Sequence, residues 1–229
     1  MKKNIILFAP LLALLFMFAC AMPPAATLQT VYPAMYSKPP ASILILPPMN
    51  NSTAADAKEY FACSLAEAIG RKGYYVMPVE AMFGVLRDEG LYDSENISPA
   101  ILQNFKKHFG ADAVLFTTIE EWEKSWALLA GSLTIKAKFA LVSTETSETI
   151  WDFGTRITVS LESEDKNLLV AMLESAVKTA MEDYFPNCLQ ANIKTMDTAL
   201  PYGKHHPQFS LDTEQTIPPN KFSDIRIEK

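Results

Sequence analysis

The stretch SLTIKAKFALVSTETSETIWDFGTRITVSL, residues 132–161, contains two segments in which apolar and polar residues alternate. The apolar face of the first segment comprises Leu133, Ile135, Ala137, Phe139 and Leu141, and the matching face of the second comprises Trp151, Phe153, Thr155, Ile157, Val159 and Leu161. A period of two indicates strands that bury one face. The polar sequence STETSE lies between the segments, so the stretch predicts an antiparallel hairpin.

Three shorter apolar runs precede this hairpin, at Ile43–Leu46, Tyr74–Met77 and Ala113–Ile119. A short continuous apolar run is typical of a strand that is buried on both faces. Pro47 and Pro48 end the first run. Together with the hairpin, these runs predict a mixed sheet of about five strands.

Helical spacing of apolar residues separates the strands. One helix contains Phe61 and ends at Gly73, a second runs from Pro78 to Asp88 before Gly90, a third runs from Ser98 to Gly110, and a long amphipathic helix covers residues 168–184. Glycine after the last helical residue is a typical left-handed stop. The predicted order is βαβααβββα, a single α/β domain with helices packed on the sheet.

Composition agrees with one domain and excludes one class of partner. The 229 residues are 49% apolar and 20% charged, which suffices for one substantial core. Without Lys2 and Lys3 of the leading segment, 18 of the 20 basic residues remain against 26 acidic ones, a net charge of −8. Nucleic-acid surfaces need clustered lysine and arginine, so we expect no nucleic-acid partner.

The leading segment has the layout of a secretory signal: Lys2-Lys3, then the apolar stretch Ile5–Ala19, then Cys20. A small residue directly before a cysteine resembles the lipobox of bacterial lipoproteins, although Met17 and Phe18 depart from its usual leucine and small residue. The alternatives are an uncleaved membrane anchor, because the 18 apolar residues up to position 22 reach the lower limit for a spanning helix, and plain secretion.

Cleavage before Cys20 would divide the chain into four parts: a signal peptide at 1–19, a lipidated cysteine with a proline-rich tether at 20–41, an α/β domain at 42–202 and a polar tail at 203–229. Residue 2 of the mature chain would be Ala21 rather than aspartate. By resemblance to the sorting rule of diderm bacteria, this implies the outer membrane, with the domain facing the periplasm. If extended, the tether could span roughly 65 Å.

Several motifs carry a family resemblance. The sequences GADAVL, residues 110–115, and LVSTETSETIW, residues 141–151, resemble the α/β domain of the TolB amino-terminal part and of the curli-secretion lipoprotein. The span from about Val31 to Tyr202 is similar to the GNA-type (genome-derived neisserial antigen) lipoproteins, a family of unknown molecular function; it includes SILILPPMNNS, GYYVMPVE and LPYG. The resemblance implies an envelope lipoprotein and supplies no catalytic residues.

Sequence motifs for catalysis, metal binding or a cofactor are also absent, so we expect no enzyme, no metal and no cofactor. His108 ends a predicted helix, and the pair His205-His206 lies in the predicted tail, where solvated residues are the simpler interpretation. The acidic group Glu120, Glu121 and Glu123 could suggest acid–base chemistry, but a solvated strand edge is the simpler reading.

Two features could carry contacts. Cys63 and Cys188 could form a disulfide in an oxidising envelope, or could be two independent, partly buried thiols. The large apolar residues in EWEKSWALLAGS are Trp122, Trp126, Leu128 and Leu129. They could form an interaction surface, or the flanking strands could extend and bring them into the core, which we favour.

Three hypotheses for function follow. The first is a non-catalytic outer-membrane lipoprotein that serves as an accessory or scaffold for an envelope transport, secretion or assembly complex, possible partners including a secretion-channel lipoprotein. The second is a tethered regulator of a cell-wall synthase, which requires a long tether. The third is an enzyme with an unrecognised site. An oligomer is compatible with all three, because related secretion lipoproteins form rings.

Overall fold

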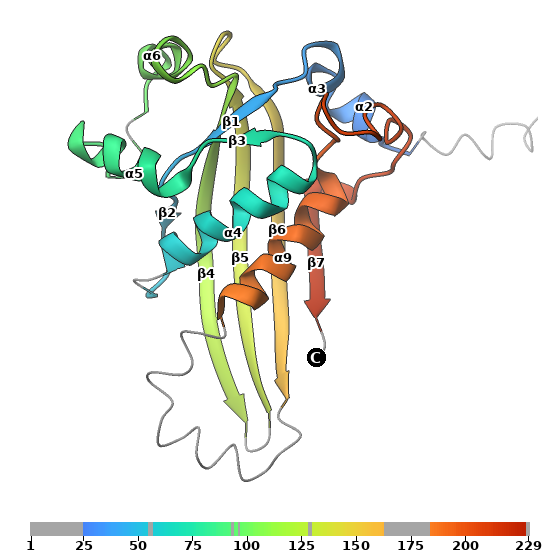
Figure 1. Ribbon diagram of the computed structural model, residues 1–229. Helices are drawn as coiled ribbons and strands as arrows, with labels where there is room; N and C mark the ends of the chain where they lie inside the picture. Colours follow the sequence, from blue (N-terminus) through green and yellow to red (C-terminus); the bar gives the residue numbers. More distant parts are fainter. Residues whose placement is uncertain are drawn as a thin grey trace, which may run out of the picture.

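The computed structural model describes residues 25–54, 57–92, 94–95, 97–127, 130–162 and 184–227 (Figure 1). The strands are β1 Ser42–Ile45, β2 Met49–Asn50, β3 Tyr75–Val76, β4 Ala113–Ala127, β5 Ala130–Ser143, β6 Thr149–Glu162 and β7 Phe222–Ile227. The helices are α2 Leu28–Val31, α3 Ala34–Ser37, α4 Ala57–Arg71, α5 Val79–Asp88, α6 Pro99–Phe109, α9 Tyr184–Ala199 and the 3₁₀ turn η1 Pro219–Lys221.

The described strands form one mixed sheet, as expected. Its order is β3-β1-β4-β5-β6-β7, and β2 also pairs with β4. The pairs β1–β3, β1–β4, β2–β4 and β6–β7 are parallel, whereas β4–β5 and β5–β6 are antiparallel. The α/β class is confirmed. The sheet has seven strands rather than about five, because β2 and β7 join it.

The predicted hairpin is present as β5 and β6. Leu141 lies opposite Trp151, and Phe139 lies opposite Phe153, so the alternating apolar residues share one face. That face is covered by α4 and α9, which pack against each other and lie in front of the long strands in Figure 1. The main core therefore lies between the sheet and these two helices.

A second, smaller core lies on the opposite face of the sheet, near its upper end in Figure 1. Alternate residues of β1 point to the two faces: Ile43 and Ile45 enter the main core, and Leu44 enters the smaller one. The smaller core is closed by Leu86 of α5 and by α6. Burial on both faces explains why β1 has no polar residue after Ser42.

Helix termini follow their sequence signals. The hydroxyl of Ser98 accepts a hydrogen bond from the backbone N–H of Ile101 and caps α6. Gly73, Gly90 and Gly110 all have positive φ angles at the ends of α4, α5 and α6. The predicted helix at 168–184 lies outside the described residues, except for Tyr184 at the start of α9. Helix α9 itself, which the sequence patterns did not indicate, begins there.

The expected tether is shorter than residues 20–41. Leu28, Tyr32 and Met35 are buried, and the Tyr32 hydroxyl donates a hydrogen bond to the backbone oxygen of Asp152. These three residues have helical spacing, so α2 and α3 present one apolar face to the domain in spite of the surrounding prolines. The folded unit therefore begins near residue 27 rather than at residue 42.

The expected polar tail is also part of the fold. β7 pairs in parallel with β6, with Gly154 opposite Phe222 and Ile157 opposite Ile225. Ile227 is buried in the main core. Alternate apolar residues on a short strand were enough to complete the edge of the sheet, although the surrounding segment is polar.

Candidate functional site

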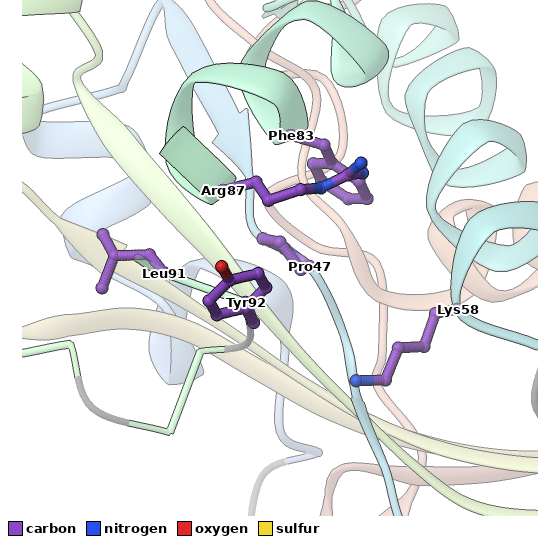
Figure 2. Close-up of a pocket in the computed structure, with 6 residues that line it drawn as sticks. All are labelled: Pro47, Lys58, Phe83, Arg87, Leu91 and Tyr92. Atoms are coloured by element: carbon purple, nitrogen blue, oxygen red, sulfur yellow. The ribbon is translucent and has the colours of Figure 1, made fainter. Parts of the chain in front are cut away.

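A pocket with a cavity volume of about 100 Å³ lies beside α5 and is drawn in Figure 2. Its walls are Pro47, Lys58, Phe83, Arg87, Leu91 and Tyr92. We call it the α5 pocket. Three separate parts of the chain form it: the connection between β1 and β2, the first turn of α4, and α5 with the segment that follows.

The end of α5 shapes one wall of the α5 pocket. Gly90 has a φ of +80°, a left-handed conformation that favours glycine. The backbone N–H of Leu91 donates a 2.8 Å hydrogen bond to the carbonyl oxygen of Leu86. This turn reverses the chain and brings Leu91 and Tyr92 back beside the helix, as in common helix C-terminal motifs.

The opposite walls come from helix faces. Phe83 and Arg87 are four residues apart on α5 and therefore lie on the same side of the helix. Lys58 enters the pocket from α4 (Figure 2). Pro47 ends β1 and supplies a rigid apolar surface.

The α5 pocket is cationic with apolar walls. Within the described residues, Lys58 and Arg87 have no ion pair, and no carboxylate lines the pocket. Lys72, Lys107, Lys194, Lys204 and Arg226 likewise have no ion pair among the described residues. Carboxylate partners are present for Lys38, Arg71, Lys106, Lys136, Lys138, Arg156 and Lys221. The arrangement can hold an anion by charge, but its lining offers no nucleophile paired with a base.

A second polar cluster joins two of the quoted motifs. The Nζ atom of Lys72 lies 3.8 Å from the centre of the Tyr202 ring, and the His206 ring stacks on Tyr202 at 4.2 Å. The backbone N–H of Gly203 donates a 2.7 Å hydrogen bond to the carbonyl of Lys72. Burial lowers the pKa of Lys72, and Asp212 is among the charges that oppose this shift. The cluster fixes LPYG against the end of α4.

Of the three histidines, only His206 differs from the expectation that all three are solvated. His108 and His205 are exposed, as expected for solvated residues, but His206 is half-buried in the stack with Tyr202. No group of three or more histidine, cysteine, aspartate or glutamate residues in the described part of the chain could hold a metal ion. In the same part, no helix has the length and apolar character needed to cross a membrane.

The acidic residues after Ile119 form ion pairs across the sheet. Glu120 contacts Lys138, and it lies 2.9 Å from Lys136. Glu121 accepts two hydrogen bonds from Arg156, at 2.9 and 3.0 Å. Hydrogen bonds from the two lysines lower the pKa of Glu120. A carboxylate held ionised in this way stabilises strand pairing and is unsuited to general acid catalysis.

The sequence EWEKSWALLAGS extends the strands. β4 continues past a bulge between Ile119 and Glu121, and the Trp126 backbone pairs with Gly131 of β5. Trp122 is 7% exposed and belongs to the main core, as the favoured interpretation predicted. Leu128 and Leu129 lie outside the described residues, as does the proposed lipidation site Cys20.

Cys63 of α4 and Cys188 of α9 are present as thiols without a disulfide. Cys188 is buried, and this burial raises the pKa of its thiol to about 12. The anionic thiolate is the reactive species, so Cys188 is chemically inert in the folded protein.

Alkylation of the native protein at pH 8 should leave Cys188 unmodified. A pKa near 12 reduces the thiolate fraction roughly a thousandfold relative to an ordinary cysteine, and burial also blocks access. Peptide mass mapping after iodoacetamide treatment measures the modification. The control is the same treatment in about 6–8 M urea, which unfolds the protein and exposes the thiol. Rapid modification in the native state would contradict the buried position of α9.

Two sequence comparisons match the chain over most of its length. The model of the family described as "Putative lipoprotein GNA1162-like" matches residues 30–206. A relative from Neisseria meningitidis serogroup B, named "Putative lipoprotein NMB1124/NMB1162", is 28% identical over 167 residues, which cover 73% of this chain and 77% of the relative.

Three solved structures are similar to parts of the chain. Lipoprotein GNA1162 from Neisseria meningitidis matches with a TM-score of 0.48 and 26% identity, over 63% of this chain and 100% of that one. A PelC dodecamer structure from Paraburkholderia phytofirmans matches with a TM-score of 0.40 and 14% identity, and the match covers 68% of this chain and 84% of that one. The LpoB C-terminal domain from Salmonella enterica matches with a TM-score of 0.35 and 17% identity, and the match covers 54% of this chain and 83% of that one.

Proposed function

Since the chain belongs to the family of GNA1162-like lipoproteins, we propose that it is a lipid-anchored protein of the outer membrane that faces the periplasm and serves a larger envelope complex without catalysis. The observation that carries the proposal is Cys20, which follows an apolar export segment in a member of a lipoprotein family. An acylated cysteine at that position would hold the folded domain at a bilayer.

The short connection to the domain decides how far the protein can reach. Leu28 is buried, so only seven residues, 21–27, separate the proposed lipid site Cys20 from the folded domain. Seven residues, fully extended, span at most about 25 Å. This reach is well below the roughly 65 Å that a 21-residue tether would allow. It favours a role at the membrane surface over regulation through the cell wall.

The fold gives the anchored domain a near end and a far end. In Figure 1, α2 and α3 lie at the upper end of the sheet, and β4 and β5 extend to the lower end. β4 has 15 residues, so its length is roughly 50 Å. An anchored domain that stands on its upper end therefore presents the far end of β4 and β5 to proteins in the periplasm.

Photocrosslinking in the native envelope tests this role. A photoreactive amino acid at Ser125, which is exposed near the far end of β4, should capture the same envelope protein reproducibly. The matched control is the same amino acid at Lys204, which is exposed beside the Lys72–Tyr202 cluster and should not capture that protein.

Mass spectrometry of the captured protein separates the hypotheses. Subunits of a channel, transporter or assembly complex support the accessory role. A cell-wall synthase would support the regulatory role instead. If neither position captures any protein reproducibly, the accessory role is wrong.

A further inference from the structure

We propose that the α5 pocket binds a small ligand in which an oxyanion, a carboxylate or a phosphate, is joined to an apolar group. This inference concerns a site that the proposed envelope role does not use, and it stands or fails independently of that role.

The charges of the pocket carry the first step. Lys58 enters it from α4 and Arg87 from α5, so two helices bring two positive charges to one cavity. The chain as a whole has a net charge of −6, yet none of the described residues that line this cavity is a carboxylate. Within the described residues, neither cation has an ion pair. Two cations that line one pocket, neither paired with a described carboxylate, make the pocket electrostatically favourable for an anion.

The chemistry of the two side chains indicates an oxyanion. Arginine presents parallel N–H donors that match two oxygens of a carboxylate or phosphate. Lysine adds a compact charge that can approach the same group from another side. Arg87 is exposed and Lys58 is half-buried, so both side chains remain hydrated and can adjust to a ligand.

The remaining walls indicate what is attached to the oxyanion. The apolar walls of the cavity are formed by Phe83, Leu91 and Pro47. Tyr92 also lines the cavity, and 69% of its surface is exposed. An exposed aromatic residue beside charged groups is a common anchor in binding sites. The cavity volume of about 100 Å³ is below the roughly 300–1,000 Å³ of ordinary ligand pockets, so we expect a small ligand.

Binding of three small probes to the full-length mature protein in detergent tests the proposal. 3-Phenylpropionate and phenyl phosphate carry the two oxyanions, and 3-phenylpropionamide is the neutral match for the first. We expect at least one of the anions to bind at least tenfold more tightly than the amide, as measured by NMR titration. Added salt should weaken that binding.

Substitutions place the binding in the α5 pocket. Arg87→Gln and Lys58→Gln should each weaken binding of the anion at least tenfold, because each removes one positive charge from the pocket. Lys107→Gln is the matched control, since Lys107 is an exposed cation on α6 outside the pocket. The dissociation constant of the anion for Lys107→Gln should stay within about twofold of that for the unsubstituted chain, because distant surface charges are screened. Thermal melts confirm that each variant is folded.

The outcomes are distinct. Tighter binding of phenyl phosphate indicates a phosphate source, and tighter binding of 3-phenylpropionate indicates a carboxylate such as a peptide terminus. Equal binding of the amide, an equal loss in Lys107→Gln, or no binding of either anion to the folded protein would overturn the proposal. None of these results depends on which protein Ser125 captures.

Discussion

Cys20→Ala should abolish the incorporation of labelled palmitate and move the protein out of the membrane fraction. The sulfur of Cys20 is the proposed attachment point of the acyl chains. Each buried methylene of an acyl chain contributes about 0.8 kcal/mol, so the loss of the chains removes nearly all membrane affinity. Autoradiography of the purified chain and fractionation of cells measure the two effects.

Ala21→Asp is the matched control for Cys20→Ala. It leaves the sulfur in place, so the variant should still incorporate palmitate. By the sorting rule of diderm bacteria, however, it should move from the outer to the inner membrane in a density gradient. Continued membrane attachment of unlabelled Cys20→Ala would show that the leading segment is an uncleaved anchor instead. Secretion of an unlabelled natural chain would show a plain export signal.

Trp151→Ala should lower the free energy of unfolding by about 3–5 kcal/mol, the usual range for removing a buried aromatic side chain. Trp151 is 1% exposed and lies among the rings of Tyr32, Phe139 and Phe153. Its indole N–H donates a 2.9 Å hydrogen bond to the backbone oxygen of Ala199. The substitution leaves a cavity and an unsatisfied carbonyl at the end of α9. Urea denaturation followed by circular dichroism measures the change.

Two variants separate packing from the hydrogen bond at Trp151. Trp151→Phe keeps a ring but removes the donor, so its cost should be smaller than that of alanine. Tyr75→Ala removes a large side chain that is 62% exposed, and it should change stability by less than about 0.5 kcal/mol. A loss below about 1 kcal/mol for Trp151→Ala would mean that Trp151 is not a central core residue.

The parts of the fold that sequence could predict are those with strong local patterns. Alternation over many residues was enough for β5 and β6, and the glycine stops marked α4, α5 and α6. β7 could not be predicted, because its place depends on pairing with β6, which lies more than 60 residues earlier. α2 and α3 were missed since their prolines resemble a tether, although Leu28 and Tyr32 are spaced for one helical face.

The same distinction applies to the candidate sites. Lipidation at Cys20 could be predicted because export and lipidation signals are read from a short contiguous stretch, and it stays a prediction. The α5 pocket could not be predicted, because Lys58 and Arg87 are separated in sequence and line one pocket only after α4 and α5 have packed. One local signal was available: Leu91 and Tyr92 are large apolar residues in a connection directly after Gly90.

The pairing of the two chain ends gives the anchored protein a mechanical property. Leu28 and Gln29 donate backbone hydrogen bonds to Gln215 and Thr213, and Ile217 donates one to Ala26. If Cys20 carries the proposed lipid, tension between the bilayer and a bound partner would enter the domain through this segment, which lies a few residues downstream of Cys20. We expect these three hydrogen bonds to break first under such tension, so the carboxyl-terminal segment would set the force that the attachment withstands.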